Sequence, residues 1–290
     1  MNTGNPTMRL LRSHASHSLL FMLLLTALAW PADAQMRGYG RRGMGPPAET
    51  QESQGGGPGF VERREGDVKA TGLTPVFSDS HNCEPIASPY ASPYRYDGSP
   101  RRDDRFAGLH GGMDLTLKEG TPLLAVAAAT VIAKGKGGQL EGNYLWLMHA
   151  PSDTGLQYWI YTKYQHLSEL PTLNEGDRVH VGQVVASSGS TGTIGGHYGA
   201  AGYPHLHLSA AIGPSGAYQR VGAFGSIIKA RDALLSDPLI LYLPQLDDLA
   251  SVASLAEDRK RVRIPVVSDD GTIVPAGSKV VWPVSCRSRK

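Results

Sequence analysis

The sequence predicts a mainly β fold with antiparallel strands, because of its pattern of apolar runs and turns. From about residue 85 to residue 213, short apolar runs are separated by turns that contain glycine, which is typical of an all-β domain. The stretch 121–133 is rich in strand-forming residues, and the glycine-rich segment 134–138 turns the chain after it. We therefore expect an antiparallel sheet as the main structure of this region.

A β-hairpin is the clearest single element in this pattern. Residues 144–148 and 158–164 have the composition of strands, and the turn sequence 151–155 lies between them. We expect these two segments to be the arms of one hairpin. The other expected elements are a turn and strand at 175–185, a short helix at 249–261, and a final hairpin of 262–267 and 272–281 with its turn at 269–271.

The first 34 residues have the three parts of an export signal. Arg9 and Arg12 give a positive start, residues 19–29 form an apolar run, and small residues at 32–34 end it. The alternative is a membrane anchor, but the apolar run is short for a bilayer span. We predict cleavage before Gln35, residence in the periplasm or outside the cell, and no membrane contact after cleavage.

Composition sets few limits on function but indicates how the chain is organised. The formal net charge is only +2, which gives no support for binding of nucleic acid or another polyanion. Residues 35–59 are rich in Gly, Pro, Arg and Gln, have almost nothing to bury, and predict a disordered arm. We expect a lead-in segment at 60–84, the main β domain at 85–245, and a small α+β extension at 246–290.

Two cysteines remain after the predicted signal, Cys83 and Cys286, one near each end of the folded region. In an oxidising compartment they can form a disulfide that joins these ends, and two separate thiols are the alternative. A bridge that closes so long a loop would contribute about 5 kcal/mol in the chain-entropy model.

Four side chains in the β region have spacings that suit a metal site. His110 and Asp114 lie four residues apart across a pair of glycines, which let the backbone bend so that both side chains reach one point. His205 and His207 lie two apart on a predicted strand, so both point to one face. Imidazole nitrogens and carboxylate oxygens are good zinc ligands, although each pair taken alone also fits an ordinary surface.

A fifth candidate, His166, ends the predicted strand 158–166. Alternation along that strand places His166 on the same face as Ile160 and Tyr164. A single histidine at a strand end is usually a packed or surface residue, so its importance depends on the motifs around it. Among the other histidines we expect a structural role for His149, an exposed turn position for His180, and a loop position near the cleft for His197.

These motifs occur together in one known family. The segment from about residue 109 to residue 211 resembles the catalytic domain of the lysostaphin/LytM zinc endopeptidases. That domain carries His-x-Gly-x-Asp, Tyr-x-His and His-x-His motifs in this order, found here at 110–114, 164–166 and 205–207. The resemblance covers a little over a third of the chain. It implies the antiparallel fold of the LytM or duplicated-hybrid-motif type, with a groove that holds the site.

The resemblance also implies a role for each of the five residues. His110, Asp114 and His207 would hold one zinc ion per chain, with the fourth position left for water. His166 and His205 would be the catalytic residues beside that water, one taking its proton and the other stabilising the oxyanion. Which of the two histidines does which stays open. The implied activity is hydrolysis of peptide bonds in peptidoglycan stem peptides or cross-bridges, with peptidoglycan as the partner.

Two other functions fit part of the sequence. A non-catalytic relative that binds the wall or activates an amidase would be expected to lose metal ligands, and all of them are present here. A biotinyl or lipoyl carrier module is suggested by residues 175–185, but it needs an exposed lysine at a hairpin tip. Lys134 and Lys136 lack the flanking pattern for that role.

Overall fold

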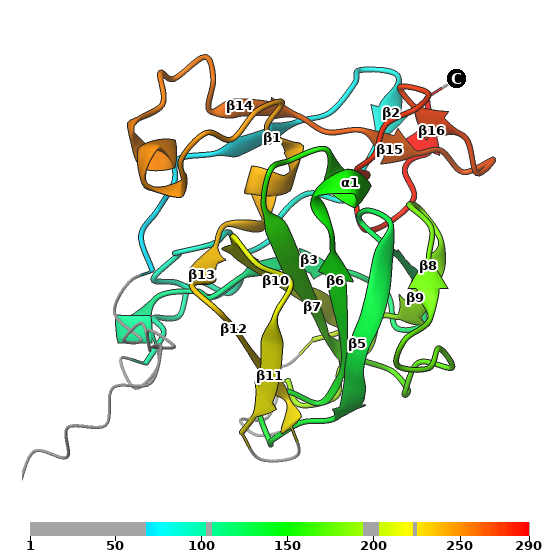
Figure 1. The fold of residues 1–290 in the computed structure, drawn as a ribbon. Helices are drawn as coiled ribbons and strands as arrows, with labels where there is room; N and C mark the ends of the chain where they lie inside the picture. The colour runs from blue at the N-terminus through cyan, green and yellow to red at the C-terminus, as the bar shows by residue number, and fades with distance from the viewer. Residues whose placement is uncertain (1–67, 103–105, 194–202, 223–224, 290) are drawn as a thin grey trace, which may run out of the picture. The chain divides into compact units, whose positions relative to one another are not determined.

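The computed structural model describes residues 68–102, 106–193, 203–222 and 225–289. The predicted signal 1–34, the predicted arm 35–59, the start of the lead-in segment and His197 lie outside the described residues. The long strands of an antiparallel sheet run side by side through the middle of Figure 1. In spatial order this sheet contains β13 (Leu234–Ser236), β10 (His205–Gly213), β7 (Trp159–Leu167), β6 (Asn143–His149), β5 (Ala129–Lys136) and β8 (Arg178–Val179), and β3 (Met113–Thr116) also pairs with β10.

Shorter elements surround this sheet. The two-stranded pairs are β1 (Thr74–Val76) with β14 (Arg261–Arg263), β2 (His81–Asn82) with β17 (Arg287–Ser288), β4 (Pro122–Leu124) with β9 (Val184–Ser187), β11 (Tyr218–Val221) with β12 (Ile227–Ala230), and β15 (Val266–Val267) with β16 (Ile273–Val274). The helical turns are α1 (Pro151–Thr154) and the 3-10 helices η1 (Phe106–Gly108), η4 (Pro238–Tyr242) and η5 (Leu249–Ser254). Within the described ranges, no helix has the length and apolar character needed to cross a membrane.

The fold class expected from the sequence is therefore confirmed, and so is the hairpin formed by β6 and β7. The connection between its arms contains the single turn α1, which begins at Pro151 and ends at Gly155 with φ 83°. The final hairpin is shorter than expected and consists of β15 and β16. Its first arm is interrupted at Pro265, which has no N–H to donate, and the preceding β14 pairs in parallel with β1 instead. The expected helix at 249–261 is limited to η5.

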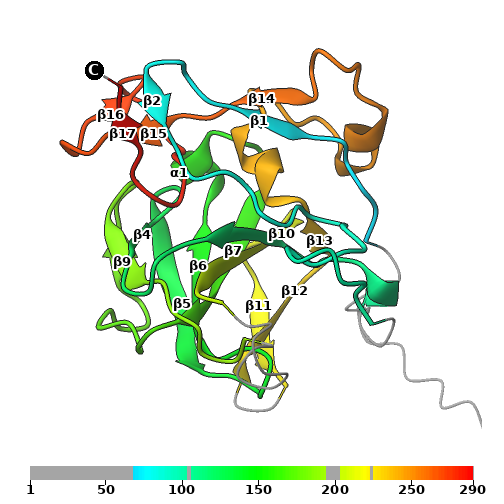
Figure 2. The ribbon, with the colours of Figure 1, turned by 180° about the vertical axis from the view of Figure 1, so that it is seen from behind.

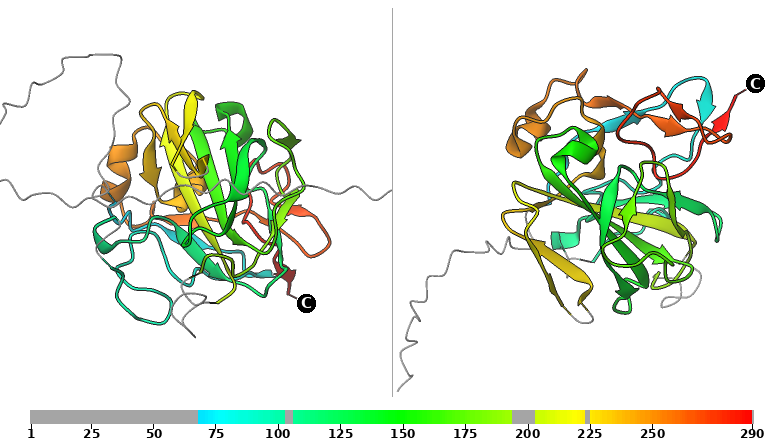
Figure 3. Two further views of the ribbon diagram at one scale, coloured as in Figure 1. Left: turned by 90° about the horizontal axis from the view of Figure 1, so that it is seen from below. Right: turned by 45° about the vertical axis from the view of Figure 1, so that its right-hand side comes forward.

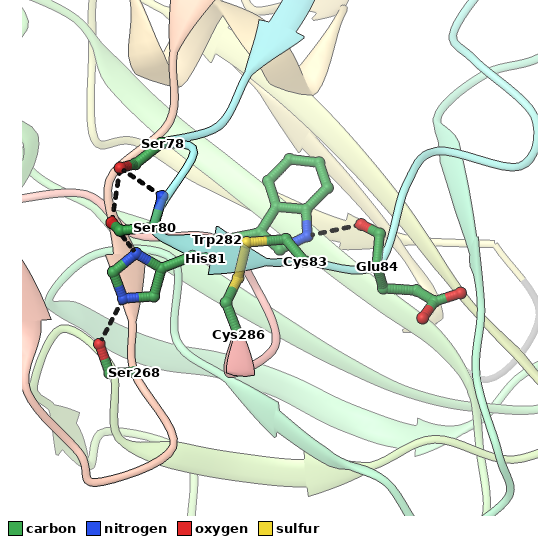
Figure 4. Close-up of a disulfide and its surroundings, with 8 residues drawn as sticks. All are labelled: Ser78, Ser80, His81, Cys83, Glu84, Ser268, Trp282 and Cys286. Atoms are coloured by element: carbon green, nitrogen blue, oxygen red, sulfur yellow. Dashed lines mark hydrogen bonds between the residues drawn. A yellow bond between two sulfur atoms is a disulfide. The ribbon is translucent and has the colours of Figure 1, made fainter. Parts of the chain in front are cut away.

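The first and last described segments lie together on one side of the sheet. The strands β1 and β2 (cyan) run beside the orange and red C-terminal strands in Figures 1 and 2 and in the right view of Figure 3. Figure 4 shows the disulfide between Cys83 and Cys286 at this place. Beside it, Trp282 donates its ring N–H to the carbonyl of Glu84 at 3.1 Å. The lead-in segment is thus tied to the C-terminal region.

The two faces of the central sheet carry different side chains. One face packs into the main core, where Leu206, Leu208 and Tyr164 meet Trp282 and the apolar side chains of η4. The opposite face carries a smaller aromatic cluster that includes Tyr161 and the β12 residue Ile228. Leu206 and Leu208 face the core, as the alternation predicts. The histidines of the same strand therefore point to the face opposite the core.

Candidate metal centre

Strand pairing brings Asp114 and His207 together. Asp114 on β3 lies directly opposite His207 on β10 in the antiparallel ladder, so both side chains point to the same face. The Nδ1 atom of His207 is 2.8 Å from Oδ1 of Asp114. Strand pairing thus places Nδ1 of His207 next to Oδ1 of Asp114, although the two residues are 93 positions apart in sequence.

His110 adds a third atom from the segment that leads into β3. Its Nε2 lies 3.1 Å from Nδ1 of His207 and 3.2 Å from Oδ1 of Asp114. The close approach needs Gly112, because a Cβ at this position would lie 2.5 Å from the carbonyl oxygen of Leu208 and 2.8 Å from Nε2 of His207. The glycine is required by the space beside β10.

The spacing of these three atoms fits a tetrahedral zinc site. Zinc binds nitrogen and oxygen at about 2.0–2.1 Å, which puts neighbouring ligand atoms of a tetrahedron roughly 3.3 Å apart. The separations here are 2.8, 3.1 and 3.2 Å, so a shift of a few tenths of an ångström would admit the ion. His110, Asp114 and His207 form a group able to hold a metal ion. Three protein ligands leave one corner of a tetrahedron open.

Hydrogen bonds to the outer nitrogens set the direction of both imidazole ligands. Nδ1 of His110 lies 2.9 Å from the carbonyl oxygen of Pro89, which can only accept, so this nitrogen carries the proton. Nε2 of His207 lies 2.9 Å from the hydroxyl of Ser209. A proton on that nitrogen leaves Nδ1 of His207 with a free lone pair. Both rings can thus present a lone pair to the same point, in the arrangement usual for metal-binding histidines.

The charge state of the group also suits a cation. Burial alone would raise the pKa of Asp114, but the adjacent imidazoles of His110 and His207 hold that pKa well below its usual range. Burial lowers the pKa of His207 to about 4, although Asp114 works in the opposite direction. At neutral pH the group therefore offers an ionised carboxylate and a neutral imidazole, the forms that bind zinc.

A β-bulge brings His166 to the same face. In the ladder between β6 and β7, Asn143 pairs with Leu167 and Tyr144 pairs with Gln165, so His166 is the extra residue. It has a positive φ of 63°. The expectation that His166 shares a face with Ile160 and Tyr164 is wrong, because the bulge breaks the alternation and turns the ring toward the β10 histidines. Its ring centroid is 4.6 Å from that of His205 and 6.0 Å from that of His207.

Nδ1 of His166 and Nδ1 of His205 are each hydrogen-bonded to the backbone, and none of the described residues forms a hydrogen bond with either Nε2 atom. The Nδ1–H of His166 donates to the carbonyl of Thr191, and that of His205 donates to the carbonyl of Tyr203, both at 2.8 Å. Nε2 of His205 then lies 3.8 Å from Oδ1 of Asp114. Burial lowers the pKa of His205 and, together with the neighbouring histidines, lowers that of His166 to about 3. Both rings are neutral at pH 7 and can accept a proton.

The other histidines lie apart from this group. His149 is fully buried between the carbonyl of Ala128 and the hydroxyl of Thr162, in agreement with the structural role predicted for it. His180 is exposed, as predicted. His81 was not among the predicted residues; it is buried near the disulfide and lies within hydrogen-bonding distance of the hydroxyls of Ser80 and Ser268 (Figure 4).

Two neighbours of the site were also not predicted. Ser209 could have been found from its position, because it lies two residues beyond His207 on the same strand and so shares its face. Arg101, whose Nη2 is 3.6 Å from Oδ2 of Asp114, comes from a loop outside the motifs and carries no signal in the sequence.

The antiparallel sheet and its His-Asp-His group form a candidate mononuclear metal centre. Residues 108–216 match the model of Peptidase family M23. The match covers that segment, a little over a third of the chain, which is therefore similar to this family. The zinc-endopeptidase resemblance expected from the motifs is thereby confirmed.

Individual relatives align over the same part of the chain. Peptidoglycan DD-endopeptidase ShyC of Vibrio cholerae is 35% identical over 112 residues, which are 38% of this chain and 22% of ShyC. Lysostaphin of Staphylococcus staphylolyticus is 34% identical over 101 residues, 35% of this chain and 18% of lysostaphin. The chain thus spans about a fifth of the length of these relatives. The crystallised catalytic domain of lysostaphin from Staphylococcus simulans aligns with a TM-score of 0.36 and 25% identity, over 53% of this chain and 88% of that domain.

Proposed function

We propose that the protein is an exported zinc endopeptidase that hydrolyses peptide bonds in bacterial peptidoglycan. The convergence of His110, Asp114 and His207 on one point carries the proposal. The match of residues 108–216 to Peptidase family M23 and the names of relatives that cut peptidoglycan support the reaction and the substrate class. The bond that is cut lies in a stem peptide or in a cross-bridge.

Different residues of the chain are proposed for metal binding and for proton transfer. His110 through Nε2, His207 through Nδ1 and Asp114 through Oδ1 would hold the ion. Once bound, zinc supplies Lewis acidity that polarises a peptide carbonyl and makes a water molecule more acidic. The rings of His166 and His205 lie beside these ligands. One of them would accept the proton of the attacking water at Nε2, and the other would stabilise the charge on the carbonyl oxygen once its own Nε2 carries a proton.

The hydrogen-bonded Nδ1 atoms explain why a helper histidine is suited to take the proton of the water. The carbonyls of Thr191 and Tyr203 fix the protons on Nδ1, so each Nε2 is available as a base at the start of the reaction. The side chains of His166 and His205 are buried, so bulk water is largely excluded from them. This exclusion strengthens their electrostatic interactions with the reacting atoms. General-base assistance of this kind contributes about 100-fold to 10,000-fold in rate.

The proposal also includes export of the protein and the boundaries of its domains. A disulfide between Cys83 and Cys286 supports an oxidising compartment, which fits the periplasm or the cell exterior. We assign the catalytic domain to residues 85–245 and the extension to 246–290. The intact ligand group favours an enzyme over a wall-binding or amidase-activating protein without metal.

Two substitutions test the metal and proton-transfer roles separately. His207→Ala should remove zinc and activity together, whereas His166→Ala should retain zinc and lose turnover. Zinc content by atomic absorption and the products released from purified sacculi, analysed by mass spectrometry, give the two readouts. His180→Ala, at an exposed turn, serves as the control and should match the wild type. A His207→Ala protein with full activity would end the assignment.

A further inference from the structure

We propose that Arg101 interacts with Oδ2 of Asp114 and thereby keeps this oxygen away from the metal. The carboxylate would then bind the metal through Oδ1 alone. The inference rests on the proposed metal site and adds a residue to it. The two oxygens of Asp114 have different neighbours. Oδ1 lies 2.8 Å from Nδ1 of His207 and 3.2 Å from Nε2 of His110, whereas Oδ2 lies 3.6 Å from Nη2 of Arg101.

Arg101 is held in this place by the strand-like segment next to β3. Its Nη2 donates to the hydroxyl of Ser88 at 2.8 Å, and its backbone N–H donates to the carbonyl of Pro93 at 2.9 Å. Ser88 is almost fully buried and its hydroxyl donates to the carbonyl of Tyr94. The carbonyl of Ser88 accepts from the N–H of Asp114 at 2.9 Å. The anchor of the guanidinium is therefore attached directly to the backbone of the carboxylate that it faces.

Burying the guanidinium group of Arg101 costs free energy, which points to a role beyond surface solubility. Its side chain is only 17% exposed, and its Nε–H is buried without a hydrogen-bond partner in the described part of the chain. Burial lowers the pKa of Arg101, while Asp114 works in the opposite direction. A second cation beside a divalent metal also adds repulsion. The attraction between Arg101 and Oδ2 of Asp114 offsets these free-energy costs. Oδ2 is the carboxylate oxygen that is not proposed as a metal ligand.

The number of oxygens that Asp114 contributes decides how much of the metal remains open. A carboxylate that binds through both oxygens would fill two positions around the ion. Bound through Oδ1 alone, it leaves a tetrahedral site with one corner for water or a substrate carbonyl. A cation at Oδ2 engages the lone pairs of that oxygen and resists rotation of the carboxylate toward the metal. Arg101 is thus a positioning residue that acts through Asp114.

Cobalt substitution tests this role without relying on turnover. Visible absorption of bound Co²⁺ is strong for four ligands and weakens when the coordination number rises. We expect the Arg101→Met protein to show a clearly weaker cobalt band and to bind zinc at least as tightly as the wild type. Its turnover of peptidoglycan should fall by about 10-fold to 100-fold, the usual effect of losing an outer partner of a metal ligand. Arg101→Lys keeps a cation near Oδ2 and should restore most of the band.

The controls separate this proposal from a general loss of structure and from failure of the proposed function. Arg178→Met breaks the Arg178–Asp153 pair, in which Nη2 and Oδ1 are 2.7 Å apart, and should leave the cobalt spectrum unchanged. Ser88→Ala keeps the charge of Arg101 but removes its anchor, and should weaken the band partly even if Arg101→Met does not fold. An unchanged band in Arg101→Met or, if that variant is unfolded, in Ser88→Ala would overturn the proposal. So would zinc affinity that falls in parallel with activity. A wild-type protein that binds no Co²⁺ would overturn the proposed function as well.

Discussion

His207 and Ser209, two residues apart on β10, are joined by a contact of 2.9 Å between Nε2 and Oγ. When the serine hydroxyl accepts the hydrogen bond from Nε2–H, the inner Nδ1 keeps its lone pair for the metal. Ser209 thus has the place that a carboxylate or backbone carbonyl often takes behind a metal-binding histidine.

Ser209→Ala should weaken zinc binding by about 10-fold to 100-fold, because the imidazole then loses the hydrogen-bond partner of its outer nitrogen. Competition with a chromophoric zinc chelator measures the affinity. Ser209→Thr retains the hydroxyl and should recover most of it. Equal zinc affinity in the alanine variant and the wild type would show that the contact has no role in holding the ligand.

Gly112→Ala should disrupt the site, because the added Cβ would lie 2.5 Å from the carbonyl oxygen of Leu208 and 2.8 Å from the ring of His207. The β3–β10 pairing or the imidazole must shift, and we expect zinc affinity to fall by about tenfold or more. Zinc titration checks the result. Gly138→Ala is the matched control, since its Cβ would have no atom within 4 Å. Full zinc affinity in Gly112→Ala would contradict the packing seen here.

Removing the disulfide by replacing Cys83 and Cys286 with alanine should lower the free energy of unfolding by about 2–5 kcal/mol. The two cysteines are separated by 203 positions, so the bridge constrains most of the described chain when it is unfolded. Denaturant unfolding of zinc-loaded protein gives the measurement. Wild-type protein treated with a reductant should show a similar loss, and identical midpoints with and without the reductant would contradict the prediction.

His149 should make stability depend on pH below neutrality. Burial lowers its pKa from 6.5 to about 4. Between these values the unfolded chain binds a proton at this residue and the folded protein does not, so the unfolding free energy falls as the pH falls. The loss is about 3 kcal/mol from pH 6.5 to pH 4. His149→Gln should flatten this part of the curve for zinc-loaded protein in a denaturant series, and an unchanged slope would contradict the assignment to His149.

Local sequence patterns were sufficient for the β class, for the hairpin of β6 and β7, and for the identity of the candidate ligands. A His-x-His spacing on a strand puts both rings on one face, and β10 obeys this rule because it is regular from His205 to Gly213. Regularity fails at His166, where the bulge between β6 and β7 changes the face. The local pattern also failed to show that the first arm of the final hairpin is interrupted at Pro265.

The sequence by itself determined the antiparallel β class, the export signal as an expectation, and the five residues proposed for the site. These depend on spacing and residue type, which the chain displays directly. Only the tertiary structure decided that Asp114 lies opposite His207, that carbonyls of Pro89, Thr191 and Tyr203 orient three of the rings, and that Arg101 faces Oδ2 of Asp114. The physical reason is that all of these contacts except the one between Tyr203 and His205 join residues well separated in sequence, and most of them use backbone carbonyls, which every residue carries.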